Sequence, residues 1–232
     1  MARVCTPPVQ AASGGVVRHH GFWLIVTGTG RCGTGFIMKV LNSCGVKCTH
    51  ERIFHPDLPS LELLAARKAN PWWGWQAESS WLAAPFLDRP EVEGMTIVHL
   101  VRRPKPTIDS MIRQGGLGNT VEGSSYYAFS ARHCPQALEI DDPCERMAYY
   151  YIFWNQMIEP HATLRWNVEH DVRGLLERLD IDYEGKDLYA DTTYNTRPGI
   201  QDSDIDLNAL PDHVRSPLRE MSERYGYGWP RS

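Results

Sequence analysis

The sequence predicts an α/β fold, in the form of a three-layer αβα sandwich with a mainly parallel central sheet. Three short runs have the composition of buried strands, at residues 23–26, 96–101 and 163–169. Each is followed by a turn and then by a segment with helical spacing of apolar residues. Strands that alternate with helices in this way are typical of a parallel sheet that helices cover on both faces.

The first of these units begins at residues 23–26, which are apolar and run into a glycine-rich turn. Residues 36–41 then have the apolar spacing of a helix, and residues 46–49 are compatible with a second strand. The aromatic segment 71–75 is expected to be a loop. Its tryptophans, Trp72, Trp73 and Trp75, could form a wall for an acceptor or for the adenine, but we favour packing under the loop.

Later elements follow the same logic. A helix is expected at residues 80–87, capped by Ser79 or Ser80, and another at 106–114 after the strand 96–101. Residues 115–135 are rich in Gly and Ser and lack a clear period, and within them we expect a loop at 115–125 that could cover an acceptor site. Further helices are expected at 145–159, 172–179 and 211–225, with a polar loop over 183–204.

Composition limits the class of protein. The 232 residues fit a loose leader over residues 1–20 and one domain over residues 21–232. No apolar stretch approaches the roughly 20 residues of a membrane span, and no secretory signal is evident, so we expect a cytoplasmic protein without membrane contact. The net charge of −4 argues against a general nucleic-acid binder. The six cysteines form no metal-ligand pattern, so neither a metal site nor a disulfide framework is expected.

The turn Gly28–Gly35 is the strongest functional signal. It contains four glycines in eight residues and lies between a strand and a helix, where backbone amides and the helix dipole converge on an anion. The lysine and hydroxyl of the ATP- and GTP-binding turn are missing, because Phe36 and Ile37 follow Gly35. The turn also meets the pattern G-x-G-x-x-G of dinucleotide sites, although Glu51, near the expected acidic position, lies in a different context.

The stretch Thr27–Phe36 resembles the donor-binding loop of sulfotransferases that use 3′-phosphoadenosine 5′-phosphosulfate. This resemblance implies a fold like that of the P-loop nucleoside-triphosphate hydrolases. It also implies that the phosphate and sulfate oxygens of the donor are held by the turn, through the following residues: Arg31, Cys32, Gly33, Thr34, Gly35 and Phe36. Cys32, where serine is usual, and Gly35, where a second hydroxyl is common, depart from the family pattern.

A second family element fits the segment from Leu100 to Ser110. The resemblance implies that Arg102, at the end of a buried strand, and Ser110, eight residues later, hold the 3′-phosphate of the donor. A guanidinium and a hydroxyl are suitable donors for a phosphate. Related enzymes often bring another basic residue from a late loop, which here is Arg197. Weaker similarities at residues 49–52, 79–85, 165–171 and 224–227 extend the resemblance over roughly residues 22–228.

Sulfuryl transfer needs a base near the acceptor and positive charge at the leaving phosphate. Glu51 and His50 are the candidates for the base, and we favour Glu51 because related sulfotransferases use a glutamate at this point in the chain. Arg31 is the candidate for the leaving group. His99, inside a strand, is expected to be structural.

We therefore expect an enzyme that transfers the sulfuryl group of 3′-phosphoadenosine 5′-phosphosulfate to a hydroxyl or amine of a small-molecule, glycan or peptide acceptor. The second product is 3′,5′-adenosine bisphosphate, and no metal is expected. A nucleotide or nucleoside kinase with a degenerate phosphate loop and a non-catalytic nucleotide-binding relative remain alternatives.

Overall fold

The computed structural model describes residues 21–70, 74–114, 117, 123–189 and 205–229. Their centre is a sheet of five strands in the order β2-β3-β1-β4-β5, and every neighbouring pair is parallel. The strands are β1 (Leu24–Thr27), β2 (Cys48–Thr49), β3 (Ala77–Ser79), β4 (Thr96–Val101) and β5 (Leu164–Asn167). The predicted α/β class with a parallel sheet is confirmed.

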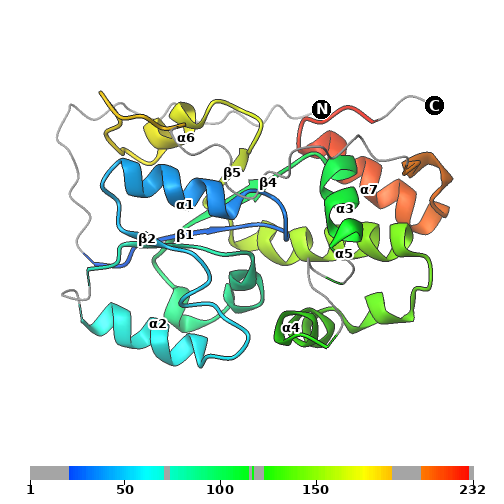
Figure 1. The fold of residues 1–232 in the computed structure, drawn as a ribbon, viewed down its shortest axis with the longest axis horizontal. Helices are drawn as coiled ribbons and strands as arrows, with labels where there is room; N and C mark the ends of the chain where they lie inside the picture. The colour runs from blue at the N-terminus through cyan, green and yellow to red at the C-terminus, as the bar shows by residue number, and fades with distance from the viewer. Residues whose placement is uncertain (1–20, 71–73, 115–116, 118–122, 190–204, 230–232) are drawn as a thin grey trace, which may run out of the picture.

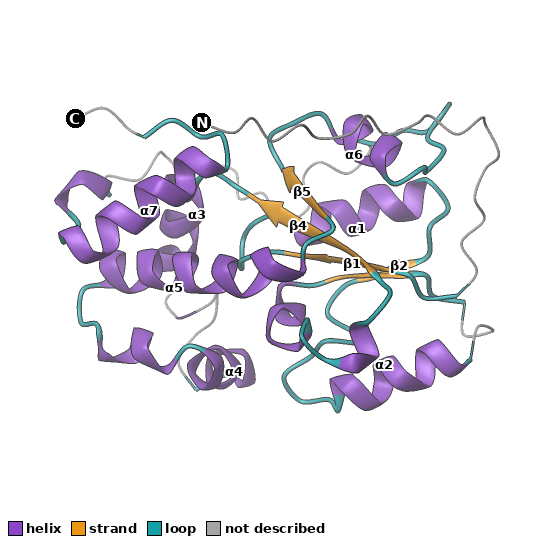
Figure 2. Cartoon of the chain, turned by 180° about the vertical axis from the view of Figure 1, so that it is seen from behind, coloured by secondary structure: helices purple, strands orange, loops and turns teal. Residues whose placement is uncertain are grey.

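Helices lie on both faces of the sheet (Figures 1 and 2). The α-helices are α1 (Thr34–Ser43), α2 (Ser60–Ala69), α3 (Pro104–Arg113), α4 (Ser125–His133), α5 (Pro143–Ile158), α6 (Val172–Arg178) and α7 (Asp212–Arg224). The 3-10 helix η2 (Trp81–Phe86) follows β3. Figure 1 shows α1 and α6 on one side of the sheet and α2, α4 and α5 on the other.

Successive strand residues supply two separate cores. In β1, Leu24 and Val26 face the core under α1 and α6, whereas Ile25 between them faces the core under α2, η2 and α5. β4 alternates in the same way, with Val98 in the former core and Ile97 in the latter. Because both faces of β1 and β4 are buried, these two strands read as apolar runs in the sequence.

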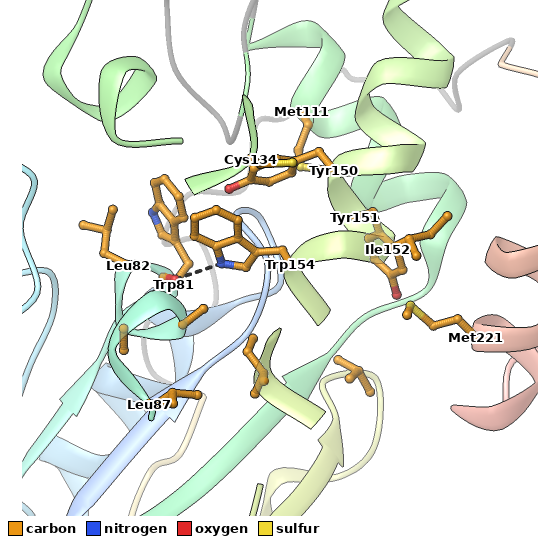
Figure 3. Close-up of a cluster of buried hydrophobic side chains, with 14 of the residues drawn as sticks. Trp81, Leu82, Leu87, Met111, Cys134, Tyr150, Tyr151, Ile152, Trp154 and Met221 are labelled. Carbon is orange, nitrogen blue, oxygen red and sulfur yellow. Dashed lines mark hydrogen bonds between the residues drawn. The ribbon is translucent and has the colours of Figure 1, made fainter. Parts of the chain in front are cut away.

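The larger core is dominated by aromatic side chains from η2 and α5 (Figure 3). Trp81 and Trp154 lie with their ring centroids 5.5 Å apart, and the indole N–H of Trp154 donates to the carbonyl oxygen of Trp81 at 3.1 Å. Tyr150 stacks on Trp154 at 4.8 Å. This packing attaches α5 to the sheet, and α3 and α7 pack in turn against α5.

The order of the strands reverses its direction of winding at β1. The connection from β1 to β2 runs one way across the sheet with α1 on one face, while the later connections run the other way with their helices on the opposite face. This change of face is what crossovers of a single hand require. In open α/β sheets, ligands bind at the carboxyl ends of the strands where the direction of winding changes. The turn Gly28–Gly33 follows β1 at this point.

The strands expected at residues 23–26, 96–101 and 163–169 and the helices expected at 106–114, 145–159, 172–179 and 211–225 are confirmed within a few residues. The strand expected at 46–49 covers only Cys48 and Thr49. The helix expected at 80–87 is a 3-10 helix that contains Pro85, although its cap, Ser80, accepts a hydrogen bond from the amide of Leu82 as predicted. A proline inside a helix removes one backbone donor, which favours a short 3-10 segment over an α-helix.

Among the described residues, the α-helices α2 and α4 and the strand β3 were missed. α4 lies in the segment 115–135, in which we found no clear period, and it begins at Ser125, where the expected loop 115–125 ends. Its first turn is Ser125–Ala128, and only Phe129 and Ser130 in the helix are buried, so its apolar period is too weak to be read from the sequence. The leader expected at residues 1–20 lies outside the described residues.

Candidate functional site

The turn after β1 requires glycine at two positions for reasons of backbone geometry. Gly33 has φ of 101°, and a Cβ atom there would lie 2.8 Å from Cγ2 of Val168. A Cβ atom on Gly28 would lie 2.1 Å from the carbonyl oxygen of Leu100 in β4. These glycines therefore let the turn pack closely on β4 and on the segment after β5, and this packing fixes its shape.

The turn ends at the N-terminus of α1, where backbone amides are available. Gly33 caps the helix without a side-chain hydrogen bond, and the first turn of α1 carries no acidic residue. Among the described residues, no acceptor lies within hydrogen-bond distance of the amides of Gly35 or Phe36. The first amides of a helix and the positive end of its dipole bind anions well.

The two motifs that the sequence analysis assigns to the donor lie together in the structure. Nη1 of Arg102, just after β4, donates to the backbone oxygen of Arg31 at 3.0 Å. Nε of Arg31 donates to Oγ of Ser110 on α3 at 2.9 Å. Arg31 is 71 positions from Arg102 and 79 positions from Ser110 in the sequence, so only the fold brings them together. Within the described part of the chain, no carboxylate forms an ion pair with Arg102.

Two buried tyrosines fix the end of β4. The hydroxyl of Tyr151 on α5 donates to the backbone oxygen of Arg102 at 2.7 Å. The hydroxyl of Tyr227 donates to the carboxylate of Glu169 at 2.5 Å and lies 3.3 Å from the backbone oxygen of Val101, which accepts the amide of Val168 at 2.9 Å. The backbone of Arg102, directly after the strand, is therefore held by Tyr151 while its guanidinium reaches the turn.

The thiol of Cys32 lies inside the fold, near Arg102 and Arg31. The Cys32 side chain is fully buried in the core under α1 and α6, and burial raises the pKa of its thiol to about 12. A thiol in such a place stays protonated and acts as a small apolar side chain. Cysteine at this position thus adds a small apolar side chain to that core.

His50 and Glu51, the candidates for the base, follow β2 at the same edge of the sheet. Nε2 of His50 lies 3.3 Å from Oγ1 of Thr34, the first residue of α1, and 3.6 Å from Oε1 of Glu51. Both side chains are 19% exposed. Burial lowers the pKa of His50, and Glu51 partly opposes this shift. His50 is thus neutral at pH 7 and able to accept a proton next to the turn.

Tyr126 on α4 joins this group, and sequence reasoning missed it. Burial and the neighbouring carboxylate of Glu51 raise the pKa of the Tyr126 hydroxyl. Its ring lies edge-on to His55, 5.4 Å away, and near Trp81 at 6.3 Å. No sequence signal marks Tyr126, because α4 itself has no clear period.

Other predicted residues lie elsewhere. Arg197, Trp72 and Trp73 lie outside the described residues. His99 is buried in β4 and hydrogen bonded to Asn155 at 2.8 Å, which is compatible with the structural role we expected. Among the described residues, no group of three or more His, Cys, Asp or Glu could hold a metal ion, and no helix is long and apolar enough to cross a membrane.

Comparisons with known proteins add no assignment. No protein-family model matches the chain, and no curated protein matches its sequence. The functional interpretation therefore depends on the site itself.

Proposed function

We propose that this chain is a sulfotransferase that moves the sulfuryl group of 3′-phosphoadenosine 5′-phosphosulfate to a hydroxyl or amine acceptor. The observation that supports this proposal most is the contact of Arg102, Arg31 and Ser110 beside the amides at the start of α1. A donor with a phosphosulfate at one end and a 3′-phosphate at the other needs two anion sites close together. The residues present fit such a donor.

In this proposal each group has a defined task. The donor supplies the activated sulfuryl group and a phosphate as the leaving group. The amides of Gly35 and Phe36, with the hydroxyl of Thr34, bind the oxygens at the phosphosulfate end, and Arg31 stabilises the negative charge that develops on the leaving phosphate. Arg102 and Ser110 bind the 3′-phosphate through charge-assisted and hydroxyl hydrogen bonds.

The base that accepts the proton of the acceptor is assigned to the pair His50 and Glu51. We favour Glu51, whose carboxylate lies beside Tyr126 and His50 and is partly exposed. A base must reach the acceptor oxygen or nitrogen directly or through one water. The position of both residues beside Thr34 puts them near the bound sulfuryl group in this proposal.

The ligand preference of the chain tests the proposal. We expect 3′,5′-adenosine bisphosphate to raise the melting temperature of the protein, because a ligand bound by the native state alone stabilises it. We expect no comparable shift with ATP and Mg²⁺ or with NAD. A shift only with ATP and Mg²⁺ would instead favour a kinase and overturn the proposal.

The base assignment has its own test. With the radiolabelled sulfate donor and unsubstituted phenol as acceptor, whose hydroxyl stays protonated at neutral pH, we expect Glu51→Gln to lower turnover by about 10²–10⁴-fold, the usual contribution of a general base. The bisphosphate should still stabilise this variant, because Glu51 is not a donor contact. The matched variant His50→Ala separates the two candidates. If both variants retain full turnover, neither residue is the base.

A further inference from the structure

A fully buried carboxylate, Glu78 in β3, lies beside the segment that carries His50 and Glu51. Its neighbour in register on β1 is Ile25, in the core under α2 and α5, and on the other side it pairs with Thr49 of β2. A carboxylate in an apolar core destabilises the fold unless hydrogen bonds satisfy its oxygens. Glu78 therefore calls for an explanation that packing alone does not give.

The hydrogen bonds of Glu78 go to residues on both sides of the candidate base. Its Oε1 accepts the backbone amide of Arg52 at 2.7 Å and that of Ile53 at 3.0 Å. Its Oε2 accepts the hydroxyl of Thr49. Thr49 immediately precedes His50, and Arg52 immediately follows Glu51. The side chain of Glu78 thus binds the backbone of the residues that follow the His50–Glu51 pair and the side chain of the residue that precedes it.

The backbone of Glu51 needs such support. Its φ is 52°, in the left-handed region that residues other than glycine rarely adopt. A residue in this region persists only where the surroundings determine its conformation. The amides that Glu78 binds belong to the next two residues, so the carboxylate fixes the chain exactly where the unusual conformation ends.

We propose that Glu78 is a positioning residue that holds the His50–Glu51 segment beside the phosphate turn. This rests on the proposed function only in taking His50 or Glu51 as the base. Burial raises the pKa of Glu78, and the hydrogen bonds from Thr49, Ile53 and Arg52 oppose that shift, as the positive charge of Arg67 nearby does. The role needs acceptor oxygens at this place and does not need a negative charge.

A matched pair of substitutions tests this role. Glu78→Met keeps the length of the side chain and removes both acceptors. Glu78→Gln keeps an oxygen for the two amides and offers its NH₂ group to the hydroxyl of Thr49. The readout is the pKa of the His50 imidazole, followed by NMR of histidine-labelled protein, which burial lowers from 6.5 in the native chain. This readout does not depend on turnover.

We expect the pKa of His50 to rise toward 6.5 in Glu78→Met and to stay lowered in Glu78→Gln. Leu176→Ala, in the core on the other face of the sheet, serves as a control that loses stability without touching the segment. A folded Glu78→Met protein in which the pKa of His50 is unchanged overturns the proposal. So does a Glu78→Gln protein that shifts as far as Glu78→Met.

If Glu78→Met fails to fold, hydrogen exchange in the native protein decides. The amides of Arg52 and Ile53 should exchange far more slowly than in the unfolded chain, because a buried carboxylate binds them. Exchange at the rate of an open loop contradicts the proposal. Binding of 3′,5′-adenosine bisphosphate, measured on the same samples, reports separately on the proposed function, so the two ideas fail independently.

Discussion

At the scale of single residues, a glycine can be required because its φ is positive or because a Cβ atom would meet a neighbour. Gly33 combines a φ of 101° with a close approach to Val168, whereas Gly45, after α1, has a φ of 83° with no atom within 4 Å of an added Cβ. The two positions therefore separate backbone strain from steric overlap.

We predict that Gly45→Ala lowers the free energy of unfolding by about 1 kcal/mol, the lower range for a non-glycine residue at positive φ. Gly33→Ala should lower it by about 2 kcal/mol or more, since Val168 must also move. Urea denaturation of both variants checks this. Equal losses would mean that the contact with Val168 does not restrict the turn.

His99 gives a second prediction at this scale. Burial lowers the pKa of His99 from 6.5 to about 4, against the opposing effect of its hydrogen bond to Asn155. The folded chain thus favours the neutral imidazole. Its contribution to stability is fully present above pH 6.5 and is lost as the pH falls toward 4, by at most about 3 kcal/mol.

The measurement is urea denaturation at several pH values, in the native chain and in His99→Gln, which retains a partner for Asn155. We expect the difference in unfolding free energy between the two proteins to shrink as the pH falls from 6.5 to 4. Carboxylates titrate in both proteins alike and cancel in the difference. A difference that is constant over this range would show that His99 is not the titrating group.

At the scale of elements, the short helix α4 is stabilised by its N-cap and by packing against the aromatic core. Ser124 caps it and accepts the amide of Tyr127 at 3.1 Å, while Phe129 packs on Trp81 and Trp154 in the aromatic core. A helix of nine residues is marginal by itself in water. The position of Tyr126 beside Glu51 therefore depends on these contacts.

We predict that Ser124→Ala destabilises α4 by about 1 kcal/mol, the usual value for loss of an N-cap. Hydrogen exchange should quicken in α4 and remain unchanged in α5. Asp142→Ala, which removes the corresponding cap of the longer helix α5, is the matched control and should leave α4 exchange unaffected. Equal exchange in α4 with and without Ser124 would show that packing alone holds the helix.

The elements differ in how well the sequence predicts them, for physical reasons. β1 and β4 are buried on both faces, so their apolar runs are unambiguous. β3 is short and contains Glu78, whose burial depends on amides from a distant segment, and no local pattern reports such a partner. Arg31, Arg102 and Ser110 could be named from motifs, whereas Tyr126 could not, because its helix has no apolar period.

At the scale of the whole molecule, the fold concentrates positive groups at one point of a chain with a net charge of −4. The reversal of winding at β1 brings the turn, the end of β4 and the start of α1 to one edge of the sheet. The anion binding that we propose is therefore a local property that depends on the tertiary structure and not on the overall charge.

The most direct measurement compares the binding of 3′,5′-adenosine bisphosphate with that of adenosine 5′-monophosphate by calorimetry. These ligands differ only in the 3′-phosphate that Arg102 and Ser110 are proposed to hold. We predict that the 3′-phosphate tightens binding by about tenfold or more, as hydrogen bonds to charged groups contribute about 1.5–3 kcal/mol each. Arg102→Ala should abolish that preference while the monophosphate binds as before. Equal affinities for the two ligands in the native chain would contradict the account.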